Sequence, residues 1–313
     1  MFPDSKKANP LSLLTRIIKL KKEKNAVILA HNYQRPEVQD IADYVGDSIE
    51  LSRKAMDEKD AELIVFAAVD FMAESAAVLN PQKKVLLPTL GARCPMAQML
   101  TVEEINRAKT LHPDAPLVLY VNTLGAAKAQ ADICCTSANV IRIIESLDSD
   151  TILFGPDRNL AEYAHRKTGK TIIPVPEYGF CPTHLLFQPE DVQLLKTRYP
   201  DAVVMAHPEC TIEMQKACDY VGSTSQMCTY AKQSRARTFI VGTEQGILHR
   251  LQKESPQKQF ILSYPDAVCP NMKLNTLERV YIALKEEKYL INIPESVARQ
   301  ARKALERMFE VTG

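Results

Sequence analysis

The chain has 313 residues, of which 46% are apolar and 25% are charged, and its 39 Lys and Arg nearly balance its 38 Asp and Glu. This composition is typical of globular proteins, and the length is enough for two or three domains. A net charge of +1 provides no basic excess for nucleic-acid binding and no acidic excess that would favour disorder.

The first residues of the chain and its longest apolar segment predict a cytoplasmic protein without a membrane partner. The first ten residues, MFPDSKKANP, are polar and lack the apolar core of a signal peptide. The longest apolar stretch, residues 63–79, is interrupted by Asp70 and Glu74 and is too polar to span a membrane. In a reducing compartment, eight cysteines are more typical of metal or catalytic roles than of disulfides.

Four landmarks follow one another in the first part of the chain. They are an apolar run at 27–32, the segment 42–48 (ADYVGDS), a second apolar run at 64–66, and Cys94-Pro95. The short β-branched runs predict strands, and the segments between them have the periodicity of helices.

The same four landmarks recur in the same order in the second part of the chain, at 118–122, 131–137, 152–154 and Cys181-Pro182. The patterns predict helices over 101–111, 124–130, 137–147 and 159–167. They predict strands over 117–122, 132–135, 151–155 and 171–175.

A third copy places the landmarks at 203–208, 218–224, 239–241 and Cys269-Pro270. Matching Ala30 with Tyr120 and Ala206 gives spacings of 90 and 86, and the three cysteines are 87 and 88 apart. Four landmarks in one order at nearly one period predict three internal repeats. Beyond them, residues 294–311 carry apolar side chains at intervals of four and predict an amphipathic helix that packs on the core.

The alternation of strands and helices predicts an α/β protein built of parallel sheets. We expect three homologous three-layer αβα domains, at residues 1–100, 101–188 and 189–313, the last including the C-terminal helices. Three equal domains in one chain close most simply as a pseudo-threefold ring.

Reactive side chains follow the first strand of each repeat, where a closed core would need none. They are His31-Asn32-Tyr33, Asn122-Thr123 and His207-Pro208-Glu209. Because ligands of parallel sheets bind beyond the carboxyl ends of the strands, we expect these residues to meet at a site on the ring axis.

Only three of the eight cysteines, Cys94, Cys181 and Cys269, recur at equivalent positions. Three thiolates select zinc, copper(I) or an iron–sulfur cluster, and the spacing does not distinguish among them. Three ligands leave one position open, which is typical of a catalytic centre. The other five cysteines are predicted to be buried, inert thiols: Cys134, Cys135, Cys210, Cys218 and Cys228.

Pairs of hydroxyl or carboxyl residues open a predicted helix in each repeat: Asp47-Ser48, Thr136-Ser137 and Ser223-Thr224. Such residues are preferred helix caps. Three helix N-termini directed at one axis would also form an anion site, and the two roles are compatible.

Several motifs together resemble the quinolinate synthase family, the A protein of bacterial and archaeal NAD biosynthesis. The resemblance covers about residues 25–285. The motifs that carry it are AHNY at 30–33, YVN at 120–122, CTSAN at 135–139, GFCPTH at 179–184, HPEC at 207–210, GSTS at 222–225 and TE at 243–244.

The resemblance implies a [4Fe–4S] cluster held by Cys94, Cys181 and Cys269, and condensation of iminoaspartate with dihydroxyacetone phosphate to quinolinate with loss of phosphate and water. It implies a functional link to L-aspartate oxidase or aspartate dehydrogenase as the source of iminoaspartate. The substrate site implied by motif position comprises His31, Tyr33, Ser48, Tyr120, Asn122, Ser137, His207, Glu209, Ser223 and Thr224.

We expect His31, His207 and Glu209 to relay protons, Tyr33 to move a proton on the triose, and the open iron to act as a Lewis acid. For Glu209 the alternative is a cap for a helix that begins near Thr211. For His184, three residues after Cys181, packing or loop orientation is the alternative to substrate contact.

Two other functions are compatible with three cysteines on an axis. One is an iron–sulfur reductive dehydroxylase of isoprenoid synthesis, which also resembles a three-domain ring. The other is a non-enzymatic anion-binding protein with a zinc or empty centre.

Overall fold

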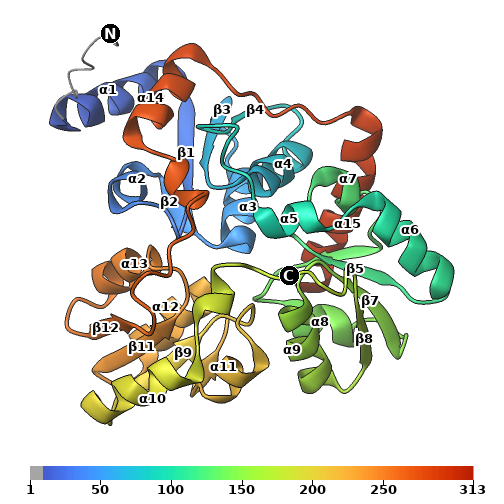
Figure 1. Cartoon of the computed structure of the whole chain (residues 1–313). Helices are drawn as coiled ribbons and strands as arrows, with labels where there is room; N and C mark the ends of the chain where they lie inside the picture. Colours follow the sequence, from blue (N-terminus) through green and yellow to red (C-terminus); the bar gives the residue numbers. More distant parts are fainter. Residues whose placement is uncertain (1–9, 313) are drawn as a thin grey trace, which may run out of the picture.

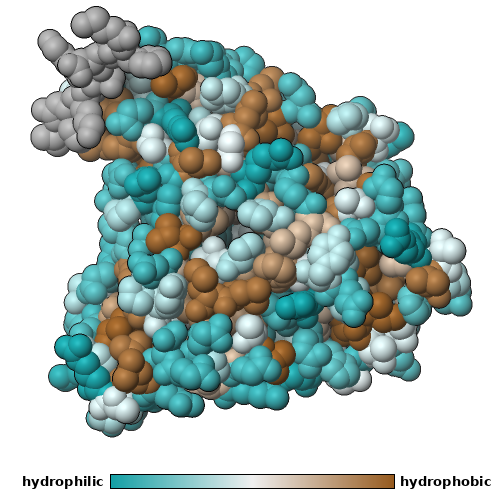
Figure 2. Space-filling model, viewed as in Figure 1, coloured by the Kyte–Doolittle hydropathy of each residue, from teal (hydrophilic) through white to brown (hydrophobic). Residues whose placement is uncertain are grey.

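The computed structural model describes residues 10–312, and Figure 1 shows three α/β units around a common centre. The polar start of the chain, from which we expect no signal peptide, lies outside the described residues apart from Pro10. Within residues 10–312, every helix is too short or too polar to cross a membrane. On the face shown in Figure 2, polar residues cover most of the surface and apolar residues form separate patches.

The first domain is a parallel four-stranded sheet with the order β2-β1-β3-β4. Its strands are β1 (Ala26–His31), β2 (Tyr44–Gly46), β3 (Leu63–Ala67) and β4 (Lys84–Leu86). Its helices are α1 (Pro10–Glu23), α2 (Pro36–Ile41), α3 (Ser48–Asp57), α4 (Asp70–Leu79) and α5 (Pro95–Met99).

The second domain repeats this sheet with the order β6-β5-β7-β8. Its strands are β5 (Leu117–Tyr120), β6 (Ile133–Cys135), β7 (Thr151–Gly155) and β8 (Thr171–Pro174). Its helices are α6 (Val102–Leu111), α7 (Gly125–Lys128), α8 (Val140–Glu145), α9 (Arg158–Thr168) and the 3-10 turn η1 (His184–Leu186).

The third domain has the order β10-β9-β11-β12, with β9 (Val203–Ala206), β10 (Tyr220–Val221), β11 (Thr238–Gly242) and β12 (Gln259–Leu262). Its helices are α10 (Pro189–Arg198), α11 (Ile212–Lys216), α12 (Thr224–Gln233), α13 (Ile247–Glu254) and the 3-10 turn η2 (Met272–Leu274). Three sheets of one topology confirm the predicted class of three homologous αβα domains.

A recurring aspartate fixes the pairing of the first two strands in every sheet. Asp43, Asp132 and Asp219 precede the second strand, and a carboxylate oxygen of each accepts a backbone N–H of the first strand. The donors are Ile28 at 2.7 Å, Leu117 at 2.8 Å and Val204 at 2.8 Å. The aspartate of the second sequence landmark therefore serves the fold rather than the site.

The strand register corrects one alignment made from the sequence. Tyr44, Ile133 and Tyr220 follow the recurring aspartates and pair with Leu29, Val118 and Met205. Counting two residues onward makes His31, Tyr120 and His207 equivalent, with spacings of 89 and 87. The match of Ala30 with Tyr120 was wrong by one residue, because β5 ends at Tyr120 and the apolar Val121 belongs to the following loop.

A helix expected from residue 137 begins three residues later, at Val140. The side chain of Asn139 accepts the Thr136 amide at 2.6 Å, and the Thr136 hydroxyl oxygen accepts the Ala138 amide at 3.2 Å. These side-chain bonds hold residues 136–139 in a turn, because they compete with the helical backbone bonds.

The two C-terminal helices pack on the first and second domains. Helix α14 (Leu277–Glu286) lies against α1 and β3, and α15 (Glu295–Thr312) lies against β6, α7, α8 and α4. Ala301, Leu305 and Met308 of α15 are fully buried, which confirms the expected core packing of this amphipathic helix.

Candidate active site

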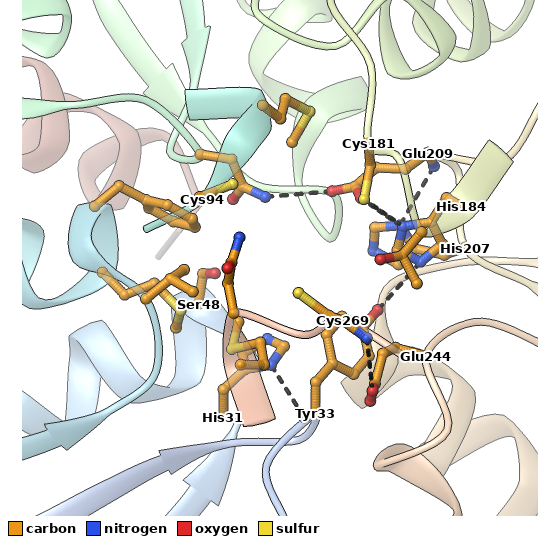
Figure 3. A pocket seen from close by; sticks show the side chains of 18 of the residues that line it. His31, Tyr33, Ser48, Cys94, Cys181, His184, His207, Glu209, Glu244 and Cys269 are labelled. Carbon is orange, nitrogen blue, oxygen red and sulfur yellow. Dashed lines mark hydrogen bonds and ion pairs between the residues drawn. The ribbon is translucent and has the colours of Figure 1, made fainter. Parts of the chain in front are cut away.

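A cavity of about 150 Å³ lies where the three domains meet (Figure 3). Twelve of the predicted site residues line it. They are His31, Tyr33, Ser48, Cys94, Tyr120, Asn122, Ser137, Cys181, His207, Glu209, Thr224 and Cys269. The pseudo-threefold arrangement therefore brings together side chains that lie more than 200 residues apart in the sequence.

The first strands of the three sheets supply two rings of polar side chains to this cavity. His31, Tyr120 and His207 occupy equivalent positions, and two residues later so do Tyr33, Asn122 and Glu209. Loops at the carboxyl ends of parallel strands place both rings at the axis, as expected for ligand sites in such sheets.

The three recurring cysteines are half-buried, and Figure 3 shows their side chains directed into the cavity. Each is a free thiol, as are all eight cysteines of the chain. Burial raises the pKa of each of the three above its ordinary value. Of the other five, Cys134, Cys135, Cys210 and Cys228 are buried as predicted, whereas Cys218 is half-buried, so the prediction of burial is wrong for that residue.

The helix-opening pairs combine capping with cavity lining, and Asp47 and Thr136 of the first members also line the cavity. Two of the three first members, Asp47 and Ser223, cap α3 and α12. The second members line the cavity: Ser48, Ser137 and Thr224.

Ser223 is the one predicted substrate residue that the cavity lining does not include. Its hydroxyl oxygen accepts the Gln226 amide, it donates to Asp47 Oδ2 at 3.0 Å, and it is fully buried away from the cavity lining. Its hydrogen bonds are those of a helix cap, which favours a structural role for this hydroxyl.

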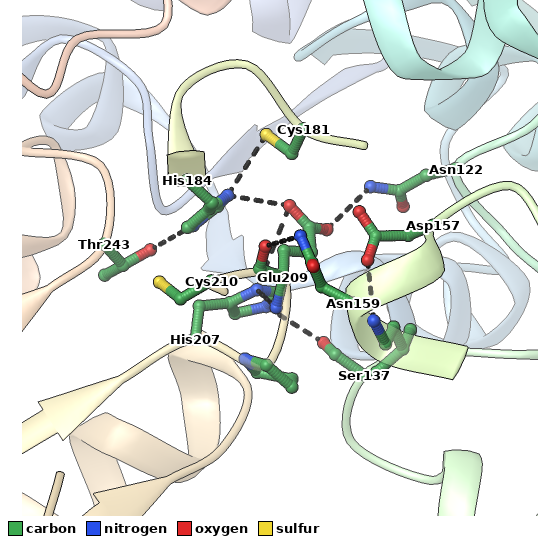
Figure 4. A network of polar contacts seen from close by, with 12 residues as sticks. Asn122, Ser137, Asp157, Asn159, Cys181, His184, His207, Glu209, Cys210 and Thr243 are labelled. Atoms are coloured by element: carbon green, nitrogen blue, oxygen red, sulfur yellow. Dashed lines mark hydrogen bonds and ion pairs between the residues drawn. The ribbon is translucent and has the colours of Figure 1, made fainter. Parts of the chain in front are cut away.

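Glu209 is the centre of a buried network of hydrogen bonds (Figure 4). One carboxylate oxygen accepts hydrogen bonds from the Tyr120 hydroxyl at 2.6 Å and from the side-chain amide of Asn122 at 3.3 Å. The other oxygen lies 2.7 Å from His184 Nδ1. Burial alone would raise the pKa of Glu209, but His207, His184 and these hydrogen bonds outweigh it and hold the pKa below its ordinary range.

The alternative role of Glu209 as a helix cap is wrong. Helix α11 begins at Ile212, and the Thr211 hydroxyl caps it by accepting the Met214 amide at 3.3 Å. The Glu209 side chain instead accepts hydrogen bonds from Tyr120 and Asn122 of the second domain.

His184 is a residue whose role the sequence left open. Its Nδ1 lies 3.1 Å from Cys181 Sγ and 2.7 Å from Glu209, and its Nε2 lies 2.8 Å from the Thr243 hydroxyl. Cys181, His184 and Glu209 offer ligand atoms within 4.8 Å of one another and could hold a metal ion. The contacts come from two domains, so no local sequence pattern could reveal them.

The two strand-end histidines are neutral. Burial lowers the pKa of His31 and of His207 to about 3. The Nδ1 atom of each accepts a backbone N–H from the residue two positions later, Tyr33 at 3.1 Å and Glu209 at 3.3 Å. Because a backbone amide can only donate, the single imidazole proton resides on Nε2 in both rings.

Comparison with known proteins gives a match along nearly the whole chain. A family model described as quinolinate synthetase A protein matches residues 15–310. The chain is 51% identical over 296 residues to the quinolinate synthase of Methanothermobacter thermautotrophicus, which is 95% of this chain and 97% of the relative. It is 49% identical over 301 residues to that of Thermotoga maritima, which is 96% of this chain and 100% of the relative.

A third relative, the quinolinate synthase of Thermococcus onnurineus, is 51% identical over 300 residues, 96% of this chain and 98% of its own. These matches favour neither the reductive dehydroxylase nor the non-enzymatic anion-binding protein. The chain belongs to the quinolinate synthetase A protein family and is an enzyme of the quinolinate synthase type.

Proposed function

We propose that the enzyme condenses iminoaspartate with dihydroxyacetone phosphate to quinolinate, with loss of phosphate and water, in the axial cavity. The observation that carries this proposal is the lining of that cavity, where thiols, hydroxyls, imidazoles and a carboxylate from three domains face one space. Both substrates are small anions, and the cavity offers the hydroxyl and amide donors that such anions need.

The cysteine set fits a [4Fe–4S] cluster better than a single metal ion. A single zinc ion with Zn–S bonds of about 2.3 Å needs sulfurs within roughly 4 Å of one another. Among the described residues, Cys181, His184 and Glu209 are grouped closely enough to share one ion, and the three cysteines together are not. A lone ion at Cys181, His184 and Glu209 would leave Cys94 and Cys269 without a role.

In this proposal Cys94, Cys181 and Cys269 hold the cluster, with one iron left free of protein ligands. When bound, that iron supplies a Lewis acid for a departing hydroxyl group. The protein's own residues bind the anions, orient them and move protons.

The anionic groups of the substrates bind the cavity hydroxyls. Ser48 and Thr224 lie at the first turns of α3 and α12, where the helix dipole favours negative charge. The Thr224 hydroxyl oxygen accepts a hydrogen bond from the side-chain amide of Asn32 at 2.8 Å. The hydroxyl proton of Thr224 is therefore left to donate to a substrate. Ser137 contributes a third hydroxyl, 3.2 Å from His207 Nε2.

A continuous series of hydrogen bonds supports proton relay from Tyr33 to Glu209. The Tyr33 hydroxyl lies 2.6 Å from that of Thr243, which lies 2.8 Å from His184 Nε2, and His184 Nδ1 lies 2.7 Å from Glu209. Burial raises the pKa of Tyr33 well above its ordinary value, so the phenol keeps its proton at rest. To accept a proton from the triose, Tyr33 would pass its own to Thr243 and onward.

The proposal also includes a source of iminoaspartate and a cytoplasmic location for the enzyme. Iminoaspartate would come from an enzyme that oxidises aspartate, L-aspartate oxidase or aspartate dehydrogenase. A reducing cytoplasm would keep the eight free thiols available for cluster assembly.

The test of the proposed reaction is product formation by the anaerobically reconstituted enzyme. With enzymatically generated iminoaspartate and dihydroxyacetone phosphate, we expect quinolinate and inorganic phosphate in equal amounts. Phosphate release without quinolinate, from protein that carries iron, would contradict the proposal.

Removal of a single cavity hydroxyl should weaken binding of the triose phosphate. We expect Ser48→Ala, Ser137→Ala and Thr224→Val each to raise the Michaelis constant about 5–30-fold, equivalent to roughly 1–2 kcal/mol. Ser223→Ala is the matched control: it should lower stability by about 0.5–2 kcal/mol through loss of a cap, with an unchanged Michaelis constant. Steady-state kinetics and thermal melts of the four variants check this, and unchanged constants in all three cavity variants would contradict it.

A further inference from the structure

A carboxylate follows the third strand of every sheet, 24 or 25 residues before the axial cysteine of the same domain. Asp70 follows β3, Asp157 follows β7 and Glu244 follows β11, with spacings of 87 and 87. The cysteines have spacings of 87 and 88, so each domain contains one such carboxylate and one such cysteine in equivalent positions. Asp157 and Glu244 are fully buried, and Asp70 is half-buried.

The carboxylates face the backbone amides of the cysteines. The Cys94 amide donates to Asp70 Oδ1 at 2.9 Å, and the Cys269 amide donates to Glu244 Oε1 at 3.1 Å. In the second domain the Cys181 amide lies near Asp157 but does not make a hydrogen bond of the same geometry, and Asp157 Oδ2 has no hydrogen-bond partner. Figure 4 shows Asp157 beside the Glu209 network.

Each carboxylate also accepts an amide at the start of the next helix. The donors are Phe71 to Asp70 at 2.9 Å, Leu160 to Asp157 at 2.7 Å and Gly246 to Glu244 at 2.7 Å. These amides help to satisfy carboxylates that would be costly to bury unpaired. In the first and third domains, one carboxylate thereby accepts hydrogen bonds both from the start of a helix and from the cysteine loop of the same domain.

The residue after each cysteine explains why this contact matters. Every one of the three is followed by proline, which has no backbone N–H. The backbone N–H of the cysteine is therefore the last backbone donor before the proline. A carboxylate that accepts this N–H restricts the direction in which the thiol can point.

We infer that Asp70, Asp157 and Glu244 are positioning residues for the three cysteine ligands, which they hold toward the axis through their backbone amides. This inference rests on the proposed cluster. Removing groups that orient metal ligands typically costs about 10–100-fold in metal affinity. The carboxylates should therefore control how firmly the cluster is retained, apart from any role in turnover.

The test is the rate at which reconstituted protein releases iron to a chelator under anaerobic conditions, below the thermal midpoint of every variant. We expect Asp70→Ala and Glu244→Ala to release iron at least about 10-fold faster than the unaltered protein. Asp70→Asn keeps an oxygen acceptor and should stay within about 3-fold of the unaltered rate.

Thr101→Ala is the matched control, because Thr101 caps α6 by accepting the Glu104 amide and not that of a cysteine. It should lower the thermal midpoint without faster iron release. Iron release at the Thr101→Ala rate in both alanine variants would overturn the inference. Unaltered protein that takes up no iron would instead contradict the proposed cluster, so the two failures are distinguishable.

Discussion

Replacement of any one axial cysteine should abolish quinolinate formation. We expect Cys94→Ala, Cys181→Ala and Cys269→Ala each to lose the cluster and to lower turnover by about 10³-fold or more, since a Lewis acid supplies several kcal/mol of stabilisation. The three thiols come from equivalent loops of three domains and face one cavity, so none can substitute for another.

Cys228→Ala is the control for this series. Cys228 is buried in α12 and does not line the cavity, so the variant should bind iron and turn over like the unaltered protein. Iron analysis and quinolinate assays of anaerobically prepared variants check both the loss expected in the axial variants and the retention expected in Cys228→Ala. A full iron content in any of the three axial variants would contradict the ligand assignment.

Glu209→Gln should keep the fold and the cluster but slow turnover at least about 10²-fold, the lower range of general acid–base catalysis. The amide would retain hydrogen-bonding capacity toward Tyr120 and His184, but it could not take up a proton from the relay. Turnover measured on iron-replete protein, with its thermal midpoint, separates a chemical effect from a structural one.

Thr211→Ala provides the comparison for Glu209. It removes the hydroxyl that caps α11 and should cost about 0.5–2 kcal/mol of stability with nearly normal turnover. Normal turnover of Glu209→Gln would mean that the relay does not end at this carboxylate, and proton transfer would then rest on His31 and His207.

The repeated features of the chain were predictable because each recurs three times. The sheets, the axial cysteines and the polar strand ends all follow from landmarks at one period. The residue-level alignment was less certain, because an apolar residue such as Val121 extends the pattern of β5 beyond its last paired residue. Only the register with β6 shows that Tyr120 matches the two histidines.

The contacts between domains could not be predicted from the sequence. His184 is held by Thr243 and Glu209, which lie 59 and 25 residues further along the chain. Ser223 and Thr224 both suit a cap or an anion site, and only the orientation of the helix start separates their roles. Asp70, Asp157 and Glu244 recur at nearly the same spacing as the three cysteines, so their equivalence is visible in the sequence.

The iron content of anaerobically reconstituted protein decides whether the three homologous domains hold one iron–sulfur cluster at their axis. We predict about four irons per chain, together with the visible absorption of a [4Fe–4S] cluster. A single zinc or iron ion per chain without that absorption would contradict the proposed cluster.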